Sequence, residues 1–356
     1  MDTDKKIQPK WKVLEYSKNQ VKKAGKLIKQ QNLSDADKQQ AIAIIDNWRA
    51  AHGYPLHVIY MNLRRMAENK PEIIVAERLK RLNSIIGKLE REQSMNLWEM
   101  QYLGGCRFIV NSIDDVYHYS KLLENSRVRH VLKRESDYIR TPKLSGYRSL
   151  HKVYEFHSDK KEEYNKHMLI EIQYRTHLQH VWATAVETMG LFTKQALKSG
   201  QGDDDIKRFF ALASSLIAKI EHQPTVPGTS DDENEIINEI RKLNSQHNYL
   251  RFLDGISVAI NHQGMTEYKT VHPMYYLLVL NYNTCRLSIR SYKASAFERA
   301  NQDYSYLENQ RNASNIDVVL VRANSFNTVR SAYPNYFSDI TEFSSIINDH
   351  LQSLIK

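Results

Sequence analysis

One stretch of the chain, residues 137–176, concentrates side chains that could act on phosphorylated molecules. Its first part is a basic, glycine-containing loop with one aromatic residue, and it runs into a strand-like segment. Lys143, Arg148 and His151 can contact anionic oxygens. Tyr147 offers a ring on which a base could stack. The loop therefore indicates a site for a nucleotide or a related polyanion.

The second part of this stretch, residues 169–175, alternates polar and apolar side chains as a half-buried strand does. This alternation places Glu171, Gln173 and Arg175 on one face of a sheet. A carboxylate between a guanidinium and an amide suits a divalent metal or a general base close to phosphates. The pattern leaves both roles open for Glu171.

A second basic segment lies at residues 78–89, where cationic and apolar residues are interleaved. Ser84 and Lys88 stand one helical turn apart within it. Backbone amides at a helix start, a hydroxyl and lysines together make a cradle for phosphates. Alone this is weak evidence, since basic amphipathic segments are common.

In their order and spacing these segments resemble the synthetase domain of the RelA/SpoT enzymes, which transfer pyrophosphate from ATP to a ribose 3′-hydroxyl. The resemblance is strong over residues 35–222 and looser elsewhere. It implies that Arg78 stacks on adenine, while Lys80, Ser84 and Lys88 hold the triphosphate.

On the acceptor side, the resemblance implies that Tyr147 stacks on the acceptor base. It assigns Glu171 the binding of Mg²⁺, the implied cofactor, or the removal of the proton from the acceptor hydroxyl. The remaining acceptor-binding residues are expected to be Lys143, Arg148, His151, Gln173 and Arg175.

One position departs from the family pattern Asp-x-x-Gly-x-Arg, in which the aspartate is a magnesium ligand. Gly105 and Arg107 match, and Arg107 is expected to face adenine from the side opposite Arg78, but the aspartate position is Tyr102. A phenol is a poor ligand for Mg²⁺. Either the chain is a disabled version of a toxic enzyme, or Glu171 and the nucleotide alone hold the metal; the first interpretation is favoured.

Two acceptors fit this resemblance. Stringent-response members of the family use GDP or GTP, whereas a toxic subgroup modifies the 3′ end of tRNA and stops translation. The chain resembles the toxic subgroup at residues 47–56 and 104–107. Residues 5–29 also carry nine lysines and one acidic residue. Because clustered cations bind a nucleic-acid backbone, tRNA is the expected acceptor and GDP or GTP the alternative.

Residues 269–356 have the pattern of a small α/β domain, and they contain Tyr-Pro-Asn-Tyr at residues 333–336. This motif resembles that of the CapRel-like fused toxin–antitoxin proteins of phage defence, in which a Tyr-x-x-Tyr motif blocks the adenine pocket. The resemblance implies that Tyr333 and Tyr336 cover Arg78 and Arg107 in a closed state. A phage structural protein such as capsid protein is expected to open it by binding this domain. The alternative is an ordinary proline turn.

The expected architecture is α+β: a mixed β-sheet flanked by helices, a helical N-terminus and a small C-terminal α/β regulatory domain. The expected divisions are 1–222 (synthetase domain), 223–268 (linker and connecting helix) and 269–356 (regulatory domain). With 356 residues, 41% hydrophobic and 26% charged, the chain has the composition of a soluble globular protein.

The sequence also bears on the compartment. No apolar run approaches the ~20 residues that span a bilayer. The polar start lacks a secretory signal, and the two cysteines fit a reducing cytosol, so a cytoplasmic protein without a membrane partner is expected. The net charge of +9 fits a polyanionic partner or a generic surface. A catalytically dead sensor or binding module and a housekeeping alarmone synthetase are the alternative functions.

Overall fold

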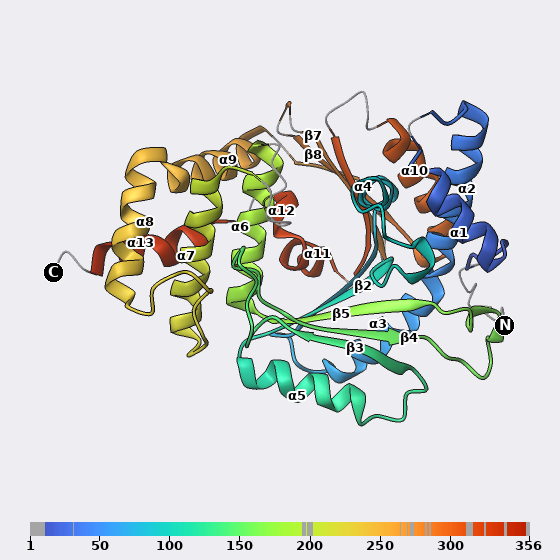
Figure 1. The fold of residues 1–356 in the computed structure, drawn as a ribbon, viewed down its shortest axis with the longest axis horizontal. Coiled ribbons are helices and arrows are strands. Elements are labelled where there is room, and N and C mark those ends of the chain that lie inside the picture. Colours follow the sequence, from blue (N-terminus) through green and yellow to red (C-terminus); the bar gives the residue numbers. More distant parts are fainter. Residues whose placement is uncertain are drawn as a thin grey trace.

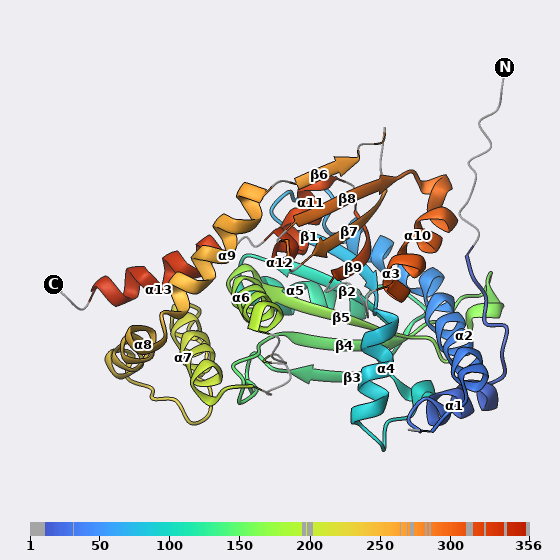
Figure 2. The same cartoon turned by 90° about the horizontal axis from the view of Figure 1, so that it is seen from above.

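The strands of the protein form one mixed sheet in the computed structural model (Figures 1 and 2). The structure describes residues 11–30, 32–193, 197, 202–263, 265–268, 270, 274–281, 283–284, 286–310, 316–323, 325–337 and 340–353. The strands are β1 (Ile74–Leu79), β2 (Gly104–Val110), β3 (Val131–Asp137), β4 (Leu150–Glu155), β5 (Leu169–Thr176), β6 (Met265–Tyr268), β7 (Tyr275–Asn281), β8 (Arg286–Tyr292) and β9 (Ile316–Arg322). Within the described residues the sheet has nine strands in the order β3-β4-β5-β2-β1-β9-β7-β8-β6.

Helices cover both faces and both ends of this sheet (Figure 1). They are α1 (Lys18–Leu27), α2 (Asp35–Ala51), α3 (Gly53–Met66), α4 (Leu82–Arg91), α5 (Ile113–Glu124), α6 (His177–Thr193), α7 (Asp204–Ile220), α8 (Glu233–His247), α9 (Tyr249–Gln263), α10 (Phe297–Gln310), α11 (Phe326–Ala332), α12 (Pro334–Phe337) and α13 (Thr341–Ser353). Short 3₁₀ turns η1 (Leu97–Glu99), η2 (Glu162–Tyr164) and η4 (Ala294–Ala296) complete the elements. The mixed α+β architecture expected from the sequence is confirmed.

The register of three neighbouring strands aligns the polar residues of the central stretch. β1 is antiparallel to β2, and Arg78 pairs with Gly105. β2 is parallel to β5, and Gly105 in turn pairs with Glu171. The next row on the same face joins Arg107 to Gln173. The sheet therefore presents cationic and acidic side chains together on one face.

The opposite face of these strands is apolar and packs on α3 and α5. Its core joins strand residues such as Phe108, Ile172 and Tyr174 to Ile59 of α3 and Val116 of α5. Burial of these side chains from water is the main force that holds the strands in register. Figure 1 shows α3 and α5 on this side, away from α4 and α6.

The N-terminal helices form a second core beside the sheet. Helix α2 begins after Ser34, whose hydroxyl caps it by accepting from the Asp37 amide. Trp48 of α2 stacks on Trp98 of η1 with 4.4 Å between ring centroids. The next helix, α3, starts at Gly53 and includes Pro55 in its first turn, where a proline lacks only a donor that would be unpaired anyway.

The segments expected to form separate domains share one sheet and one helical core. β9 extends the sheet by pairing with β1 at Arg322 and Glu77. Helix α13 packs into the same core as α6, α7 and α8, through Phe343 and Ile347 among others. Residues 224–230, expected to be a linker, are anchored where the Val226 amide donates to the Ser215 hydroxyl at 2.9 Å. The divisions at residues 222 and 268 remain predictions.

In the C-terminal segment β7 and β8 pair antiparallel, from Tyr275 with Tyr292 to Asn281 with Arg286. None of the helices in the described part of the chain is long and apolar enough to cross a membrane. Cys106 is a free, buried thiol, whereas Cys285 lies outside the described residues.

Gly146 provides a test of how the central loop packs. Its φ is +88°, and an added Cβ would lie 2.8 Å from Trp182 and 3.1 Å from the carbonyl oxygen of Phe210. Gly228 has a similar φ of +85° with nothing within 4 Å of such a Cβ. We expect Gly228→Ala to cost about 1 kcal/mol of unfolding free energy, the backbone penalty alone.

Gly146→Ala is expected to cost several times more, because the backbone penalty is joined by overpacking of roughly 1–3 kcal/mol. Denaturant unfolding of both variants measures the difference. Equal losses for the two variants would show that α6 and α7 do not pack against the loop as described.

Candidate active site

Two adjoining cavities lie on the polar face of the central strands. The first, here called the arginine cavity, has a volume of about 170 Å³ and is lined by Arg78, Lys80, Tyr102, Gly105, Cys106, Arg107, Glu171, Gln173 and Tyr333. The second, the Tyr138 cavity, has a volume of about 430 Å³. It is lined by Lys88, Met95, Glu99, Met100, Gln101, Tyr102, Arg134, Ser136, Tyr138, Lys143, His151, Val153 and Glu171. Tyr102 and Glu171 line both cavities and so mark their junction.

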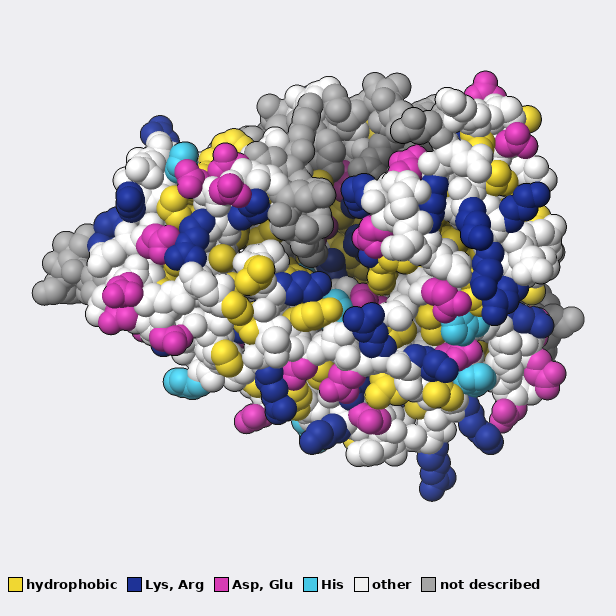
Figure 3. Space-filling model, in the orientation of Figure 1, with side chains coloured by type: hydrophobic (Ala, Val, Ile, Leu, Met, Phe, Trp, Pro, Cys, Tyr) yellow, Lys and Arg dark blue, Asp and Glu magenta, His cyan; other side chains and the backbone are white. Residues whose placement is uncertain are grey.

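The arginine cavity brings together residues that lie almost a hundred positions apart in the sequence. Arg78 lies near the end of β1, Arg107 lies on β2 and Glu171 on β5, and the sheet register sets all three side by side. Figure 3 shows Lys and Arg side chains gathered around a hollow between α4 and α6 in this view. The cavity can therefore hold an anionic ligand next to one carboxylate.

Arg107 is buried and is held by the C-terminal part of the chain. Its Nη1 donates to the carbonyl oxygen of Ala332 at 2.7 Å, and its Nη2 lies 4.0 Å from the Glu187 carboxylate. Ala332 ends α11, where a helix presents unpaired carbonyls and partial negative charge. Burial and the nearby Arg78 lower the pKa of Arg107 to about 10.

The ring of Tyr333 lies over both arginines. Its centroid is 5.0 Å from the guanidinium carbon of Arg107 and 5.9 Å from that of Arg78. Only 1% of Tyr333 is exposed, and its ring forms part of the lining of the arginine cavity. Stacking of a guanidinium on an aromatic face is favourable, by roughly 0.5–2 kcal/mol for a desolvated pair.

Tyr336, the second tyrosine of the motif, contacts a different group. Its hydroxyl donates to the Asp317 carboxylate at 2.8 Å. Asp317 in turn forms a buried ion pair with Arg81, the residue that directly precedes α4. The sequence predicts that both rings cover the arginines, but the stacking contacts with Arg78 and Arg107 belong to Tyr333, and Tyr336 ties β9 to the start of α4.

Tyr102 occupies the junction of the cavities together with two lysines. The Nζ atoms of Lys80 and Lys88 lie 4.9 Å and 4.2 Å from the centroid of its ring. Burial and the positive charges of Arg78 and Lys88 lower the pKa of Lys80 to about 8. Ser84, predicted to bind phosphate with these lysines, lies on the first turn of α4 and is not among the residues that line either cavity.

Both carboxylate oxygens of Glu171 accept hydrogen bonds from neighbouring side chains. Oε1 accepts from Nδ1 of His151 at 3.0 Å, and Oε2 accepts from Nε2 of Gln173 at 2.7 Å. Burial alone would raise its pKa, but these bonds and the charge of Lys80 lower it to about 2. Glu171 is therefore ionised at neutral pH and has a fixed orientation.

A buried hydrogen-bonded chain supports His151 from behind. With Nδ1–H directed to Glu171, Nε2 of His151 accepts from the Tyr147 hydroxyl at 2.8 Å. The same hydroxyl accepts from Nη2 of Arg175 at 3.2 Å, and Gln173 accepts from Nη2 at 2.5 Å. Tyr147 and Arg175 are 6% and 1% exposed, so they position His151 and Gln173 and do not face a cavity. This geometry does not favour the predicted stacking of the acceptor base on Tyr147.

The aromatic side chain that faces the second cavity is Tyr138. Lys143, predicted to bind the acceptor, lines this cavity, and its Nζ lies 4.3 Å from the Tyr138 ring centroid. Arg134 and Ser136 of β3 and Tyr138, directly after the strand, are spaced by two residues and line the same cavity. This spacing was the signal in the sequence that could have identified them.

Arg148 corrects the sequence-based prediction, because it does not line either cavity. It is 2% exposed and donates to the Ser214 hydroxyl at 3.1 Å, to the Ile139 carbonyl at 3.1 Å and to the Pro224 carbonyl at 2.6 Å. Its guanidinium therefore ties the central loop to α7 and the segment that follows. Its role is structural.

The residues at the junction do not fit a resident magnesium ion. Within the described part of the chain, no cluster of three or more His, Cys, Asp or Glu side chains could hold a metal ion. Glu171 is the one carboxylate shared by the cavities, and both of its oxygens already accept hydrogen bonds. Mg²⁺ prefers carboxylates and phosphate oxygens, whereas two ammonium groups lie on Tyr102 here.

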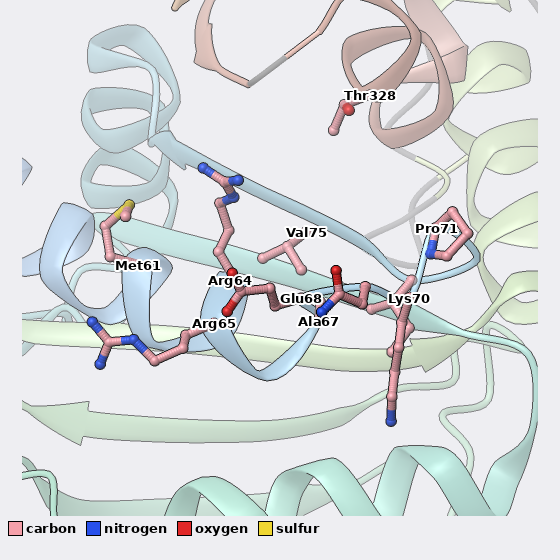
Figure 4. Close-up of a pocket in the computed structure, with 11 residues that line it drawn as sticks. Met61, Arg64, Arg65, Ala67, Glu68, Lys70, Pro71, Val75 and Thr328 are labelled. Atoms are coloured by element: carbon pink, nitrogen blue, oxygen red, sulfur yellow. The ribbon is translucent and has the colours of Figure 1, made fainter.

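A further cavity of about 640 Å³ lies near the end of α3 and includes Arg64, Arg65 and Lys70 in its lining. Figure 4 shows that these three cations point in different directions. Lys70 donates to the Tyr119 hydroxyl, and Arg64 lies over the Tyr60 ring. The cations do not converge on one point, so this cavity is a weaker candidate for an anion site.

Comparisons with known proteins identify related sequences. Residues 77–195 match the family described as "Region found in RelA / SpoT proteins". The chain is 35% identical over 161 residues to GTP pyrophosphokinase YjbM of Bacillus subtilis, spanning 44% of this chain and 72% of the relative. It is also 35% identical over 114 residues to GTP pyrophosphokinase YwaC of the same organism, spanning 30% of this chain and 52% of the relative.

Solved structures with a partial likeness come from the same group. The small alarmone synthetase 1 of Bacillus subtilis bound to its product pppGpp has a TM-score of 0.40 and 28% identity, covering 49% of this chain and 89% of that chain. A GTP pyrophosphokinase family protein of Streptococcus pneumoniae has a TM-score of 0.40 and 27% identity, and the match covers 53% of this chain and 91% of that chain.

The contrast between Arg148 and Lys143 gives a test of the site. Arg148→Met leaves buried carbonyl and hydroxyl groups without their donor, and we expect a loss of at least about 2 kcal/mol of unfolding free energy. Lys143→Met changes an exposed cavity residue, so its unfolding free energy is expected to change by less than about 0.5 kcal/mol. Denaturant unfolding measures both. A stable Arg148→Met protein would contradict the structural role of this side chain.

Proposed function

Because the chain belongs to the RelA/SpoT family of pyrophosphokinases, we propose that it transfers pyrophosphate from ATP to a ribose 3′-hydroxyl. The arginine cavity would bind the ATP donor, and the Tyr138 cavity would bind the acceptor. One observation supports this assignment above all: Arg78, Arg107 and Glu171 share a cavity, and Glu171 also lines the neighbouring one. A carboxylate at the junction can reach a group in either cavity.

The donor is proposed to bind by charge and stacking. Arg78 and Arg107, which now contact the Tyr333 ring, would hold the adenine in the same manner. Lys80 and Lys88 would contact the polyphosphate, since their ammonium groups lie at the junction toward which it would extend.

In the transfer step, the acceptor 3′-oxygen attacks the β-phosphorus of ATP. A bond forms between these two atoms, the bond from the β-phosphorus to the oxygen shared with the α-phosphate breaks, and AMP leaves with that oxygen. Glu171 would accept the hydrogen bond of the attacking hydroxyl and take its proton as the new bond forms. Positioning and neutralisation of phosphate charge provide the remaining acceleration.

The described conformation is proposed to be an autoinhibited one. The ring of Tyr333 covers Arg78 and Arg107 in the arginine cavity, and the peptide that carries it is held at two places. Arg107 donates to the Ala332 carbonyl, and Nε2 of His180 contacts the Ser331 carbonyl at 2.9 Å. A partner that binds the C-terminal segment better in an open state would release the cavity. By resemblance to fused toxin–antitoxin proteins, that partner would be a phage structural protein such as capsid protein.

Two acceptors are proposed, each for its own reason. A guanosine nucleotide, GDP or GTP, is supported by the relatives, which are named GTP pyrophosphokinases. The 3′ end of tRNA is supported by the lysine-rich helix α1, which packs against η1, whose Glu99 lines the Tyr138 cavity. Lys12, Lys18, Lys23 and Lys26 are exposed there and could contact a nucleic-acid backbone.

A catalytically dead sensor or binding module is the alternative of a different class. Tyr102 supports it, since the family pattern places a magnesium ligand at this position. Such a module would bind its partner yet form no labelled product with any acceptor, even with the arginine cavity open. The two assays that follow distinguish the alternatives.

Substitution of Tyr333 tests autoinhibition. Tyr333→Ala removes the ring that covers Arg78 and Arg107, and we expect ATP affinity to rise by at least about tenfold, or 1.4 kcal/mol. Tyr336→Phe is the matched comparison, because it removes only the hydroxyl that donates to Asp317 and leaves Tyr333 in place. Calorimetric titration with ATP measures both. Unchanged affinity in Tyr333→Ala would contradict occlusion by this ring.

The acceptor is tested with ATP labelled at the β-phosphate and the Tyr333→Ala protein. We expect the label to appear on GDP or GTP, or on tRNA, and not on tRNA whose 3′-terminal hydroxyls have been oxidised. If tRNA is the acceptor, neutralising the exposed lysines of α1 should reduce the rate of transfer to tRNA and make that rate less sensitive to salt concentration. The rate of transfer to GDP should be unaffected. Transfer to GDP alone would refute the tRNA proposal.

A further inference from the structure

The ring of Tyr102 holds two ammonium groups where the two cavities meet. Nζ of Lys80 lies 4.9 Å and Nζ of Lys88 lies 4.2 Å from the ring centroid. The face of an aromatic ring carries partial negative charge, so it attracts a cation without cancelling its charge. The ring thus keeps two like charges close together, and both remain available to an anion.

The backbone holds this arrangement in place before a ligand binds. The Lys80 amide donates to the Leu103 carbonyl at 2.7 Å, which ties the lysine to the residue after Tyr102. The Lys80 carbonyl accepts from Nε of the buried Arg49 at 2.7 Å. Lys88 projects from α4, with its Nζ 3.5 Å from the Glu92 carboxylate. A preorganised pair loses little further freedom when it binds phosphate.

The charges around the pair favour a polyanion. Three cations, Arg78, Lys80 and Arg107, line the arginine cavity against the single carboxylate of Glu171. Burial and repulsion among these groups lower the pKa values of both Lys80 and Arg107. A triphosphate placed between them would relieve that repulsion.

We propose that Lys80 and Lys88, held on the ring of Tyr102, replace the charge that Mg²⁺ supplies in the family, so that this chain binds the triphosphate of ATP without a divalent metal. The proposal rests on the proposed function, in which ATP is the donor. Two ammonium groups carry the same total charge as one divalent ion. An aspartate at residue 102 would instead pair with these lysines or with Mg²⁺, whereas the tyrosine ring holds the lysines without neutralising them.

The experiment uses the full chain with Tyr333→Ala, which opens the arginine cavity, and circular dichroism confirms that each variant is folded. Titration calorimetry measures the dissociation constant of ATP in excess Mg²⁺ and in excess EDTA. For the Tyr333→Ala protein we expect the two constants to agree within about threefold. Adding Tyr102→Asp is expected to make binding weaker in EDTA than in Mg²⁺ by about tenfold or more.

Three further variants separate the ring from its hydroxyl and from the lysines. Tyr102→Phe keeps the ring and is expected to retain binding in EDTA. The pair Lys80→Met and Lys88→Met is expected to lose at least about tenfold in affinity under both conditions, since its cations are gone. Lys121→Met, an exposed lysine on α5, is the control for the loss of one positive charge.

A second readout does not depend on nucleotide affinity. Electron paramagnetic resonance of Mn²⁺ should show a tightly bound, ATP-dependent ion only in the Tyr102→Asp protein. Loss of ATP binding in EDTA by the Tyr333→Ala protein, or a tightly bound Mn²⁺ in it, would overturn the proposal. If ATP binds to none of the variants with or without Mg²⁺, the donor assignment itself fails, and the two failures are thereby distinguished.

Discussion

A shift of one residue between β2 and β5 would turn Glu171 away from the cavity that it shares with Arg78 and Arg107, because successive side chains of a strand point to opposite faces. The paired rows of β1, β2 and β5 are therefore the constraint on which the site depends. The apolar face on α3 and α5 enforces this register, since a slip would bring Glu171 and Gln173 into that core. Core packing and ligand binding are thus two results of one strand alignment.

The same alignment explains how one tyrosine ring contacts both arginines of the arginine cavity. Arg78 and Arg107 lie on neighbouring strands, and both guanidinium groups lie against the ring of Tyr333. Tyr333 is brought there by α11, whose last carbonyl accepts from Arg107. One arginine therefore recognises both the ring and the peptide that carries it, and a ligand must displace both contacts.

Local patterns in the sequence predicted the elements that local interactions determine. The alternation over residues 169–175 identified β5, and the Ser34 cap marked the start of α2. What the sequence did not predict depends on distant partners. Arg148 resembles a phosphate ligand in isolation, but Ser214 and Pro224, more than sixty residues later, determine where its side chain lies. Tyr138 and Tyr147 are both tyrosines of the same stretch of chain, and the sequence does not distinguish them. Packing against α6 and α7 buries Tyr147, whereas Tyr138 lines the second cavity.

The junction of β9 with β1 has a consequence for how the C-terminal segment can be removed. Backbone groups of β1 that face β9 pair with it at Glu77 and Arg322, and the adjoining Ala76 is covered by the core of α11 and β9. If the chain were cut before β7, β1 would become an edge strand. Its backbone hydrogen-bonding groups would be unpaired, and the apolar side chains beside it would be exposed. Such edges recruit strands from other molecules. A shortened protein would therefore tend to self-associate, and reduced solubility would contribute to its behaviour in a cell.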